Sequence, residues 1–275
     1  DGAPAFADAW GGVRILAKAD GAEGWSFRRQ GRGDAALVVG SDLLYGSGAD
    51  GWLYALGRVD GREHWRVRVG ARLAARPLLE SDRLYVPTAD GRLLVVDEVD
   101  GALLHSVDIG ALASDGVHVG AGFLLAAFGD GYVRAYEKDA LDLKWQRRIG
   151  AKTSLAVFAK VILCAADIGW LYGLYPRDGR ILWRQDLGAA PLGAAVKGPR
   201  GEAVIGTATG RVLAIDPISG ALAWDVQLLE GRGAYVAQGE GGFFVRGGDD
   251  YLYAFAEVEP LGVEGVVLWE RWWQV

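Results

Sequence analysis

Short runs in which apolar and polar residues alternate recur along the whole chain. One such run, Arg92 to Asp97, follows the apolar segment Leu84 to Val86, and the dipeptide Asp90-Gly91 stands between them. Alternation with a period of two is typical of β-strands with one buried face. Asp-Gly between two such runs indicates a tight hairpin, because both turn residues tolerate a positive φ. The pattern therefore predicts antiparallel strands joined by short turns.

These runs come in groups of up to four, and the last run of each group carries a Trp or a replacement for it. The positions are Trp25, Trp65, His105, Trp145, Trp183, Trp224 and Trp269. The spacings between neighbours are 40, 40, 40, 38, 41 and 45 residues. A period in this range, filled with short strands, predicts a β-propeller.

We expect an all-β fold: a seven-bladed β-propeller of four-stranded antiparallel blades, forming a single domain over residues 1–275. The approximate repeats are residues 1–30, 31–70, 71–110, 111–150, 151–188, 189–228 and 229–275. The first repeat starts at its second strand, so the first blade is expected to be incomplete. Three alternatives stay open: residues ahead of Asp1 were removed, the blade has three strands, or the C-terminal segment helps to close the ring.

The recurring Trp residues are expected to be structural docking residues that pack each blade against the next. They are Trp25, Trp65, Trp145, Trp183, Trp224 and Trp269. A small or apolar residue stands ten positions before several of them, as Ala55, Ala135 and Gly173 do, and would leave room for the ring. Burying one Trp at such a contact stabilises a fold by a few kcal/mol. Two positions depart from the pattern: His105 replaces a Trp, and Leu141 stands where Gly is usual.

The segments Ala214 to Trp224 and Tyr172 to Trp183 carry this pattern most clearly. They resemble the Trp-docking repeat of the pyrroloquinoline quinone-like β-propellers, and the resemblance extends over nearly the whole chain. It is closest in type to the non-enzymatic lipoprotein of the outer-membrane β-barrel assembly machinery. The resemblance implies a periplasmic scaffold that binds an outer-membrane assembly subunit. No local motif carries that family's partner-contact residues over to this sequence.

Composition indicates which kinds of binding partner and which cellular location to expect. The net charge of -6, without strong local blocks, argues against a nucleic-acid partner. No apolar run is long enough for a transmembrane segment, and a lipid anchor is not visible. The chain has no Met and begins at Asp1, so we expect a removed secretory signal and a periplasmic or otherwise exported protein. A trimmed fragment would look the same.

The sequence offers little for catalysis. Quinoprotein dehydrogenases of this superfamily carry an adjacent pair of Cys residues, whereas Cys164 is the only Cys here and stands in an apolar strand. The three His residues share no metal-ligand spacing. Turn acids such as Asp50, Asp90, Asp130 and Asp250 are expected to bond to their own backbone. We therefore predict no enzyme activity, no cofactor, no metal and no catalytic residue.

One weaker pattern concerns binding. In four connections that lead from a Trp strand to the next blade, a basic residue follows a Gly within two positions. These residues are Arg32, Arg72, Lys152 and Arg232. They could form a basic rim for an acidic segment of a protein partner, or they could be ordinary solvated loop charges. The connections with Leu112 and Ala190 lack the basic residue.

The sequence therefore favours a non-enzymatic periplasmic protein–protein interaction scaffold that resembles the propeller subunit of outer-membrane protein assembly. Two alternatives stay open. The chain could be the propeller module of a larger exported sensor or enzyme, or a small-ligand binder that uses the central channel. Apolar first strands, such as Leu155-Ala156-Val157, weigh against the channel ligand.

Overall fold

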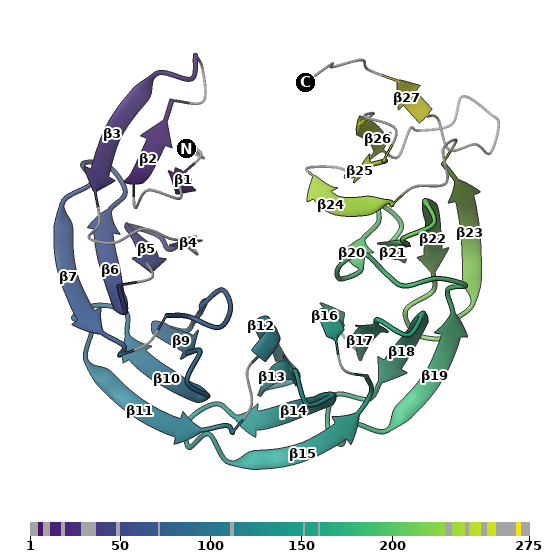
Figure 1. Ribbon diagram of the computed structural model, residues 1–275, viewed down its shortest axis with the longest axis horizontal. Coiled ribbons are helices and arrows are strands. Elements are labelled where there is room, and N and C mark those ends of the chain that lie inside the picture. Colours follow the sequence, from purple (N-terminus) through teal and green to yellow (C-terminus); the bar gives the residue numbers. More distant parts are fainter. Residues whose placement is uncertain are drawn as a thin grey trace. The chain divides into compact units, whose positions relative to one another are not determined.

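Figure 1 shows the computed structural model of the chain. The structure describes residues 5–7, 12–17, 20–28, 37–47, 50–70, 72–110, 113–150, 152–158, 160–228, 233–239, 242–248, 252–256 and 268–270. All regular elements among them are β-strands, and these form seven antiparallel sheets. The prediction of an all-β, seven-bladed propeller is confirmed.

The first three sheets lie in the N-terminal part of the chain. Blade one contains β1 (Ala5–Ala7), β2 (Gly12–Leu16) and β3 (Glu23–Arg28). Blade two contains β4 (Leu37–Val39), β5 (Leu43–Ser47), β6 (Trp52–Gly57) and β7 (Glu63–Arg68). Blade three contains β8 (Leu78–Glu80), β9 (Arg83–Pro87), β10 (Arg92–Asp97) and β11 (Leu103–Asp108). Blade one has three strands among the described residues, as the missing first segment predicts.

The remaining four sheets each have four strands in chain order. Blade four contains β12 (Ala113–Gly120), β13 (Phe123–Phe128), β14 (Tyr132–Glu137) and β15 (Leu143–Arg148). Blade five contains β16 (Thr153–Phe158), β17 (Val161–Ala166), β18 (Trp170–Leu174) and β19 (Ile181–Asp186). Blade six contains β20 (Val196–Lys197), β21 (Ala203–Gly206), β22 (Arg211–Ile215) and β23 (Leu222–Gln227). Blade seven contains β24 (Tyr235–Gly239), β25 (Gly242–Arg246), β26 (Leu252–Ala256) and β27 (Leu268–Glu270). Each sheet lies within one of the seven repeat ranges that the sequence predicts.

The chain divides into two compact units. The first comprises residues 1–117 and 139–141, and the second comprises residues 118–138 and 142–275. Residues 139–141, the turn between β14 and β15, therefore pack with the first unit although their own sheet lies mainly in the second. That the whole chain forms a single domain stays a prediction.

The core of each unit lies between neighbouring sheets and consists mainly of second and third strands. Every residue of β17 is buried, and β10 is buried from Leu93 to Val96. Strands covered on both faces read as continuous apolar runs, which explains why Val161 to Ala166 lacks alternation. Fourth strands are different, because they alternate between exposed and half-buried positions, as β19 and β23 do.

The turns between second and third strands follow the sequence prediction. Gly51, Gly91 and Gly131 have φ of 75°, 88° and 88°, in the left-handed region that favours Gly. Asp50 Oδ1 and Asp130 Oδ1 each accept a hydrogen bond of 3.1 Å from the backbone N–H two residues later. These acids therefore stabilise their own turns, as the sequence predicts. Asp250 lies outside the described residues.

Candidate functional site

The docking Trp residues make one recurrent contact with the next sheet. The indole N–H of Trp25 donates to the carbonyl of Arg58, and that of Trp65 donates to the carbonyl of Glu98, both at 3.0 Å. Trp145 donates to Pro176 at 3.0 Å, and Trp183 donates to Pro217 at 3.1 Å. Each acceptor belongs to the turn between the third and fourth strands of the following blade. The bond gives each buried or half-buried indole its polar partner and fixes the ring against that turn.

A Gly of the same turn lies directly beneath the ring. A Cβ built on Gly61 would stand 2.5 Å from Trp25 Cε3, and one on Gly101 would stand 2.6 Å from Trp65 Cε3. Gly179 and Gly220 meet Trp145 and Trp183 in the same way. All four Gly residues have positive φ, between 67° and 75°. The turn Gly of one blade is therefore required by the Trp of the preceding blade as well as by its own backbone.

The small residue ten positions before several of the Trp residues has a separate role. Ala55 is the cross-strand partner of Trp65, and Gly173 is the partner of Trp183, within the same sheet. A Cβ on Gly173 would collide with the Trp183 ring. In both sheets the strand register shifts directly after this pair, which marks a β-bulge. The small residue therefore accommodates the ring inside its own blade, while the turn Gly accommodates it in the next one.

The two departures from the repeat fall at the same joint. His105 occupies the Trp position of blade three, and Leu141 occupies the Gly position of the following turn. Leu141 keeps a positive φ of 58° and is buried, with 3% of its surface exposed. Residues 139–141 pack with the first unit, which contains His105. Position 105 therefore carries no indole, and the following turn carries a buried Leu in place of the Gly that lies beneath the Trp at four other joints.

The last two docking positions differ from the others. The Trp224 ring stacks with Phe243 and Phe255, at centroid distances of 6.2 Å and 6.5 Å. Those two rings lie 4.7 Å apart and nearly parallel. Aromatic stacking therefore joins blade six to blade seven. For Trp269 the structure describes the backbone, which pairs with Ala254, and its docking role stays a prediction.

Two residues of the predicted basic rim lie within the described part of the chain. The backbone carbonyl of Arg72 accepts from the N–H of Ala89 at 2.8 Å, and that of Lys152 accepts from Asp167 at 2.9 Å. The backbone carbonyl of Ala190 likewise accepts a hydrogen bond from the N–H of Ala208 at 2.8 Å. The three residues therefore occupy equivalent places in their blades, next to the turn between the second and third strands. Both basic side chains are exposed. Arg32 and Arg232 lie outside the described residues.

The same end of the blades carries arginine–aromatic contacts that the sequence analysis missed. The guanidinium of Arg66 lies 5.4 Å from the ring centroid of Trp52, and that of Arg184 lies 5.0 Å from that of Trp170. Arg134 lies over both Phe128 and Tyr132, at 4.6 Å and 5.3 Å. Trp52, Tyr132 and Trp170 each lie in a third strand and directly follow the turn Gly. The sequence therefore contained a signal for these contacts. Arginine over aromatic rings is a frequent feature of protein interfaces.

Two acids at this end, Asp90 and Asp130, have a lowered pKa. Hydrogen bonds from Thr88 and Arg92 lower the pKa of Asp90. Burial alone would raise the pKa of Asp130, but the hydrogen bonds from Arg134 and from the Tyr132 N–H lower it overall.

Among the described residues, no three His, Cys, Asp or Glu side chains lie close enough to hold a metal ion. Cys164 is fully buried. No helix in the described ranges could cross a membrane.

Comparison with known protein families shows which family the chain belongs to. A protein-family model described as outer membrane protein assembly factor BamB matches residues 9–160 and 167–273. The chain belongs to this family.

Two solved structures share the fold of this BamB-family chain. One is BamB from Moraxella catarrhalis, with a TM-score of 0.69 and 17% identity over 90% of this chain and 74% of the other. The second is the computationally designed protein Ika8, with a TM-score of 0.77 and 14% identity over 92% and 80% of the two chains. At these identities the structural likeness supports the fold alone. No curated protein sequence matches the chain significantly.

Proposed function

We propose that this BamB-family chain is a non-enzymatic scaffold of the periplasm that binds protein partners in outer-membrane protein assembly. The observation that carries the proposal is the family match, which extends over nearly all of the seven blades. The family is named for an assembly factor, and a repeated, rigid fold suits a protein that presents surface loops to other chains. A subunit of the outer-membrane assembly machinery is the partner that we propose.

The surface that we propose for this contact is the end of the blades where second strands turn into third strands. Two observations support it. In the first unit this end of the blades carries the exposed side chain of Arg72 and the Arg66–Trp52 pair, and in the second unit it carries the exposed side chain of Lys152 and the Arg184–Trp170 pair. Basic and aromatic side chains on rigid turns fit a partner segment that carries acidic residues, because complementary charge speeds association and aromatic groups supply contact area.

The test uses this chain as bait in envelope extracts of the source cell, with mass spectrometry as the readout. The bait variants are wild type, R72E/K152E and a matched control, R62E/K144E. Arg62 lies in the turn between β6 and β7, and Lys144 lies at the start of β15, so both control residues lie at the opposite end of their sheets and are exposed. Each pair reverses one Arg and one Lys, so the net charge change is the same.

Wild type and the control should recover an outer-membrane assembly subunit, and R72E/K152E should recover about tenfold less of it. This result would support both the scaffold function and the proposed surface. A reduction of about tenfold is the effect expected from the loss of two exposed charge contacts. Equal recovery by all three baits would support the scaffold and remove the basic rim. Recovery of no assembly subunit by any bait would contradict the scaffold itself.

A further inference from the structure

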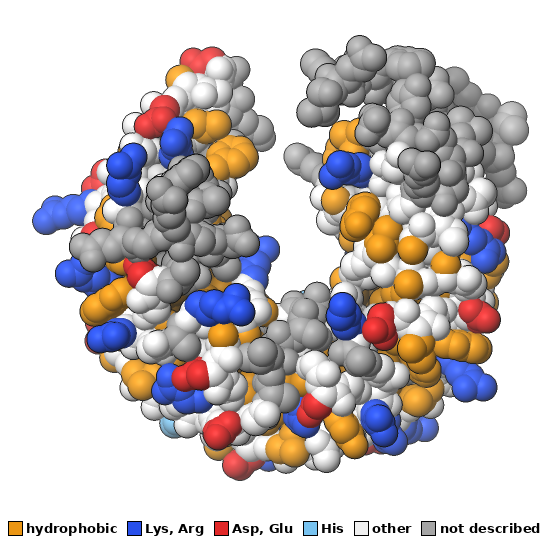
Figure 2. Space-filling view, in the orientation of Figure 1, with side chains coloured by type: hydrophobic (Ala, Val, Ile, Leu, Met, Phe, Trp, Pro, Cys, Tyr) orange, Lys and Arg blue, Asp and Glu red, His pale blue; other side chains and the backbone are white. Residues whose placement is uncertain are grey.

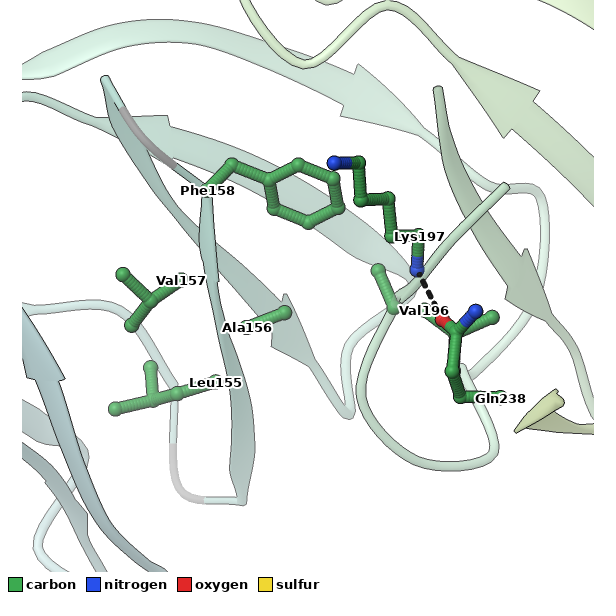
Figure 3. Close-up of a pocket in the computed structure, with 8 residues that line it drawn as sticks. Leu155, Ala156, Val157, Phe158, Val196, Lys197 and Gln238 are labelled. Carbon is green, nitrogen blue, oxygen red and sulfur yellow. Dashed lines mark hydrogen bonds between the residues drawn. The ribbon is translucent and has the colours of Figure 1, made fainter. Parts of the chain in front are cut away.

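A cleft opens between the first strands of blades five, six and seven, within the second unit (Figure 3). Its volume is about 390 Å³. It is lined by Leu155, Ala156, Val157 and Phe158 of β16, Ala195, Val196 and Lys197 at β20, and Gln238 of β24. Figure 2 shows hydrophobic side chains gathered on this face near β20 and the strands beside it.

The apolar wall of the cleft follows from strand alternation. Ala156 and Phe158 point from β16 toward β20, while Leu155 and Val157 point to the other side, as Figure 3 shows. Val157 instead packs close to Gly120. Because Ala156 is small, space remains between β16 and Val196. A ligand in this space would therefore meet the methyl group of Ala156, the ring of Phe158 and the side chain of Val196.

The polar side chains of the cleft reduce to one cation. The carboxamide of Gln238 is already bonded: Oε1 accepts from the N–H of Lys197 at 3.0 Å, and Nε2 donates to the carbonyl of Gly242 at 3.2 Å. Lys197 is exposed, and no carboxylate of the described residues pairs with its ammonium group. In Figure 3 the Lys197 side chain extends from β20, and both it and Phe158 line the cleft. The cleft therefore combines an apolar body with a single positive charge at one end.

The size of the cleft limits what can fill it. A water molecule takes about 30 Å³ of liquid, so the cleft has room for about a dozen of them, or for a ligand body of similar atom count. The volume also falls within the usual range of small-molecule sites, about 300–1,000 Å³.

We propose that this cleft binds a monocarboxylate with an apolar body of about a dozen non-hydrogen atoms. The body lies between Ala156, Phe158 and Val196, and the carboxylate lies against the Lys197 ammonium. Such a group comes from two sources, a free alkyl or arylalkyl acid and the C-terminal residue of a peptide. The site is separate from the scaffold surface proposed above, and its test does not depend on that function.

The experiment titrates the ¹⁵N-labelled chain with 4-phenylbutyrate and with its neutral analogue, 4-phenylbutyramide, and follows the amide resonances. We expect saturable shifts at Phe158, Val196 and Lys197. The acid should bind about fivefold more tightly than the amide, the amount expected of one exposed ion pair. A second arm uses N-acetyl-alanyl-phenylalanine and its C-terminal amide, and so separates the peptide source from the free acid.

Three variants and one control decide the outcome. K197Q should remove the preference for the acid, whereas K144Q, at another exposed Lys on β15, should keep it. A156F should abolish binding of acid and amide alike by filling the cleft. A156V fills less of the cleft and should weaken both, which covers the case in which the larger ring impairs folding. Shifts that map elsewhere, equal binding of acid and amide, a K197Q variant that keeps the preference, or the absence of saturable binding would each overturn the proposal.

Discussion

Gly101 of blade three lies so close beneath Trp65 of blade two that a Cβ on the Gly would stand 2.6 Å from Cε3 of the ring. The same indole donates its N–H to the carbonyl of Glu98, three residues earlier in the same turn. The turn therefore contacts the Trp in two ways: through one hydrogen bond and through the backbone of a Gly that has no side chain. This joint recurs between blades one and two, four and five, and five and six.

The first prediction concerns the space beneath the ring. Gly101→Ala should lower the free energy of unfolding by about 2–4 kcal/mol, because it adds overpacking against Trp65 to the cost of a positive φ. Gly21→Ala is the matched control. Gly21 has a similar φ of 72°, but a Cβ there would meet no atom within 4 Å, so only the backbone cost of about 1–2 kcal/mol remains. Urea denaturation measures both, and equal losses would show that the ring imposes no constraint.

The second prediction concerns the exceptional joint of His105 and Leu141. His105→Trp alone should destabilise the chain, since the indole would meet Leu141 where other joints have Gly. Leu141→Gly alone should also destabilise it, by about 2–4 kcal/mol for the lost burial. The double variant should recover more than about 1 kcal/mol relative to the sum of the single changes. Chemical denaturation of all four proteins gives the coupling, and additive losses would mean that the two positions are independent.

The third prediction concerns alkaline pH. Burial, together with the hydrogen bond that its hydroxyl donates to Asp50 at 2.7 Å, raises the pKa of Tyr54 to about 12. Its unfolded value is about 10. The stabilisation from protonated Tyr54 is therefore complete below about pH 10 and is lost as the pH rises toward about 12, because the unfolded chain releases its proton first.

Tyr54→Phe should accordingly reduce the loss of stability between about pH 10 and about pH 12, measured by urea denaturation at each pH. Tyr235→Phe, at an exposed position, serves as the control and should keep the wild-type pH dependence. The idea fails if both variants lose stability over this range as steeply as the wild type does.

The fourth prediction concerns the turn between β8 and β9. Ser81 and Asp82 have φ of 50° and 61°, the pattern of a type I′ turn that carries Ser-Asp in place of the preferred Asn-Gly. S81N/D82G should raise the free energy of unfolding by about 1 kcal/mol, because Asn and Gly adopt positive φ at lower cost. Thermal and urea denaturation measure the gain, and a neutral or negative change would show that other contacts decide this turn.

Several features of this fold could be predicted from the sequence because they depend on neighbours in the chain. The Asp90-Gly91 hairpin and the Trp period are of this kind. The joint of Trp65 with Gly101 could not be predicted, because it joins two blades and each residue already has a local reason to be present. His105 and Leu141 were visible as separate departures, and only the packing of residues 139–141 with the first unit relates them.

The candidate sites show the same limit. The equivalence of Arg72 and Lys152 follows from the repeat, and the backbone bonds to Ala89 and Asp167 give it a geometric basis. The cleft depends on Ala156, Val196 and Gln238, which belong to three blades. No short motif contains them, so only the folded chain brings them together.

The joints also give the blades a direction. At the four joints that share this geometry one blade offers an indole and the next offers a turn Gly, so blades two and five each hold two unlike halves of two different joints. Duplicating or transplanting one sheet of this chain would therefore break a matched pair at each cut. The segment that can be exchanged intact runs from one Trp to the turn that receives it. In blades three and four, a sequence change would have to retain or replace His105 and Leu141 together, although the two residues belong to different sheets.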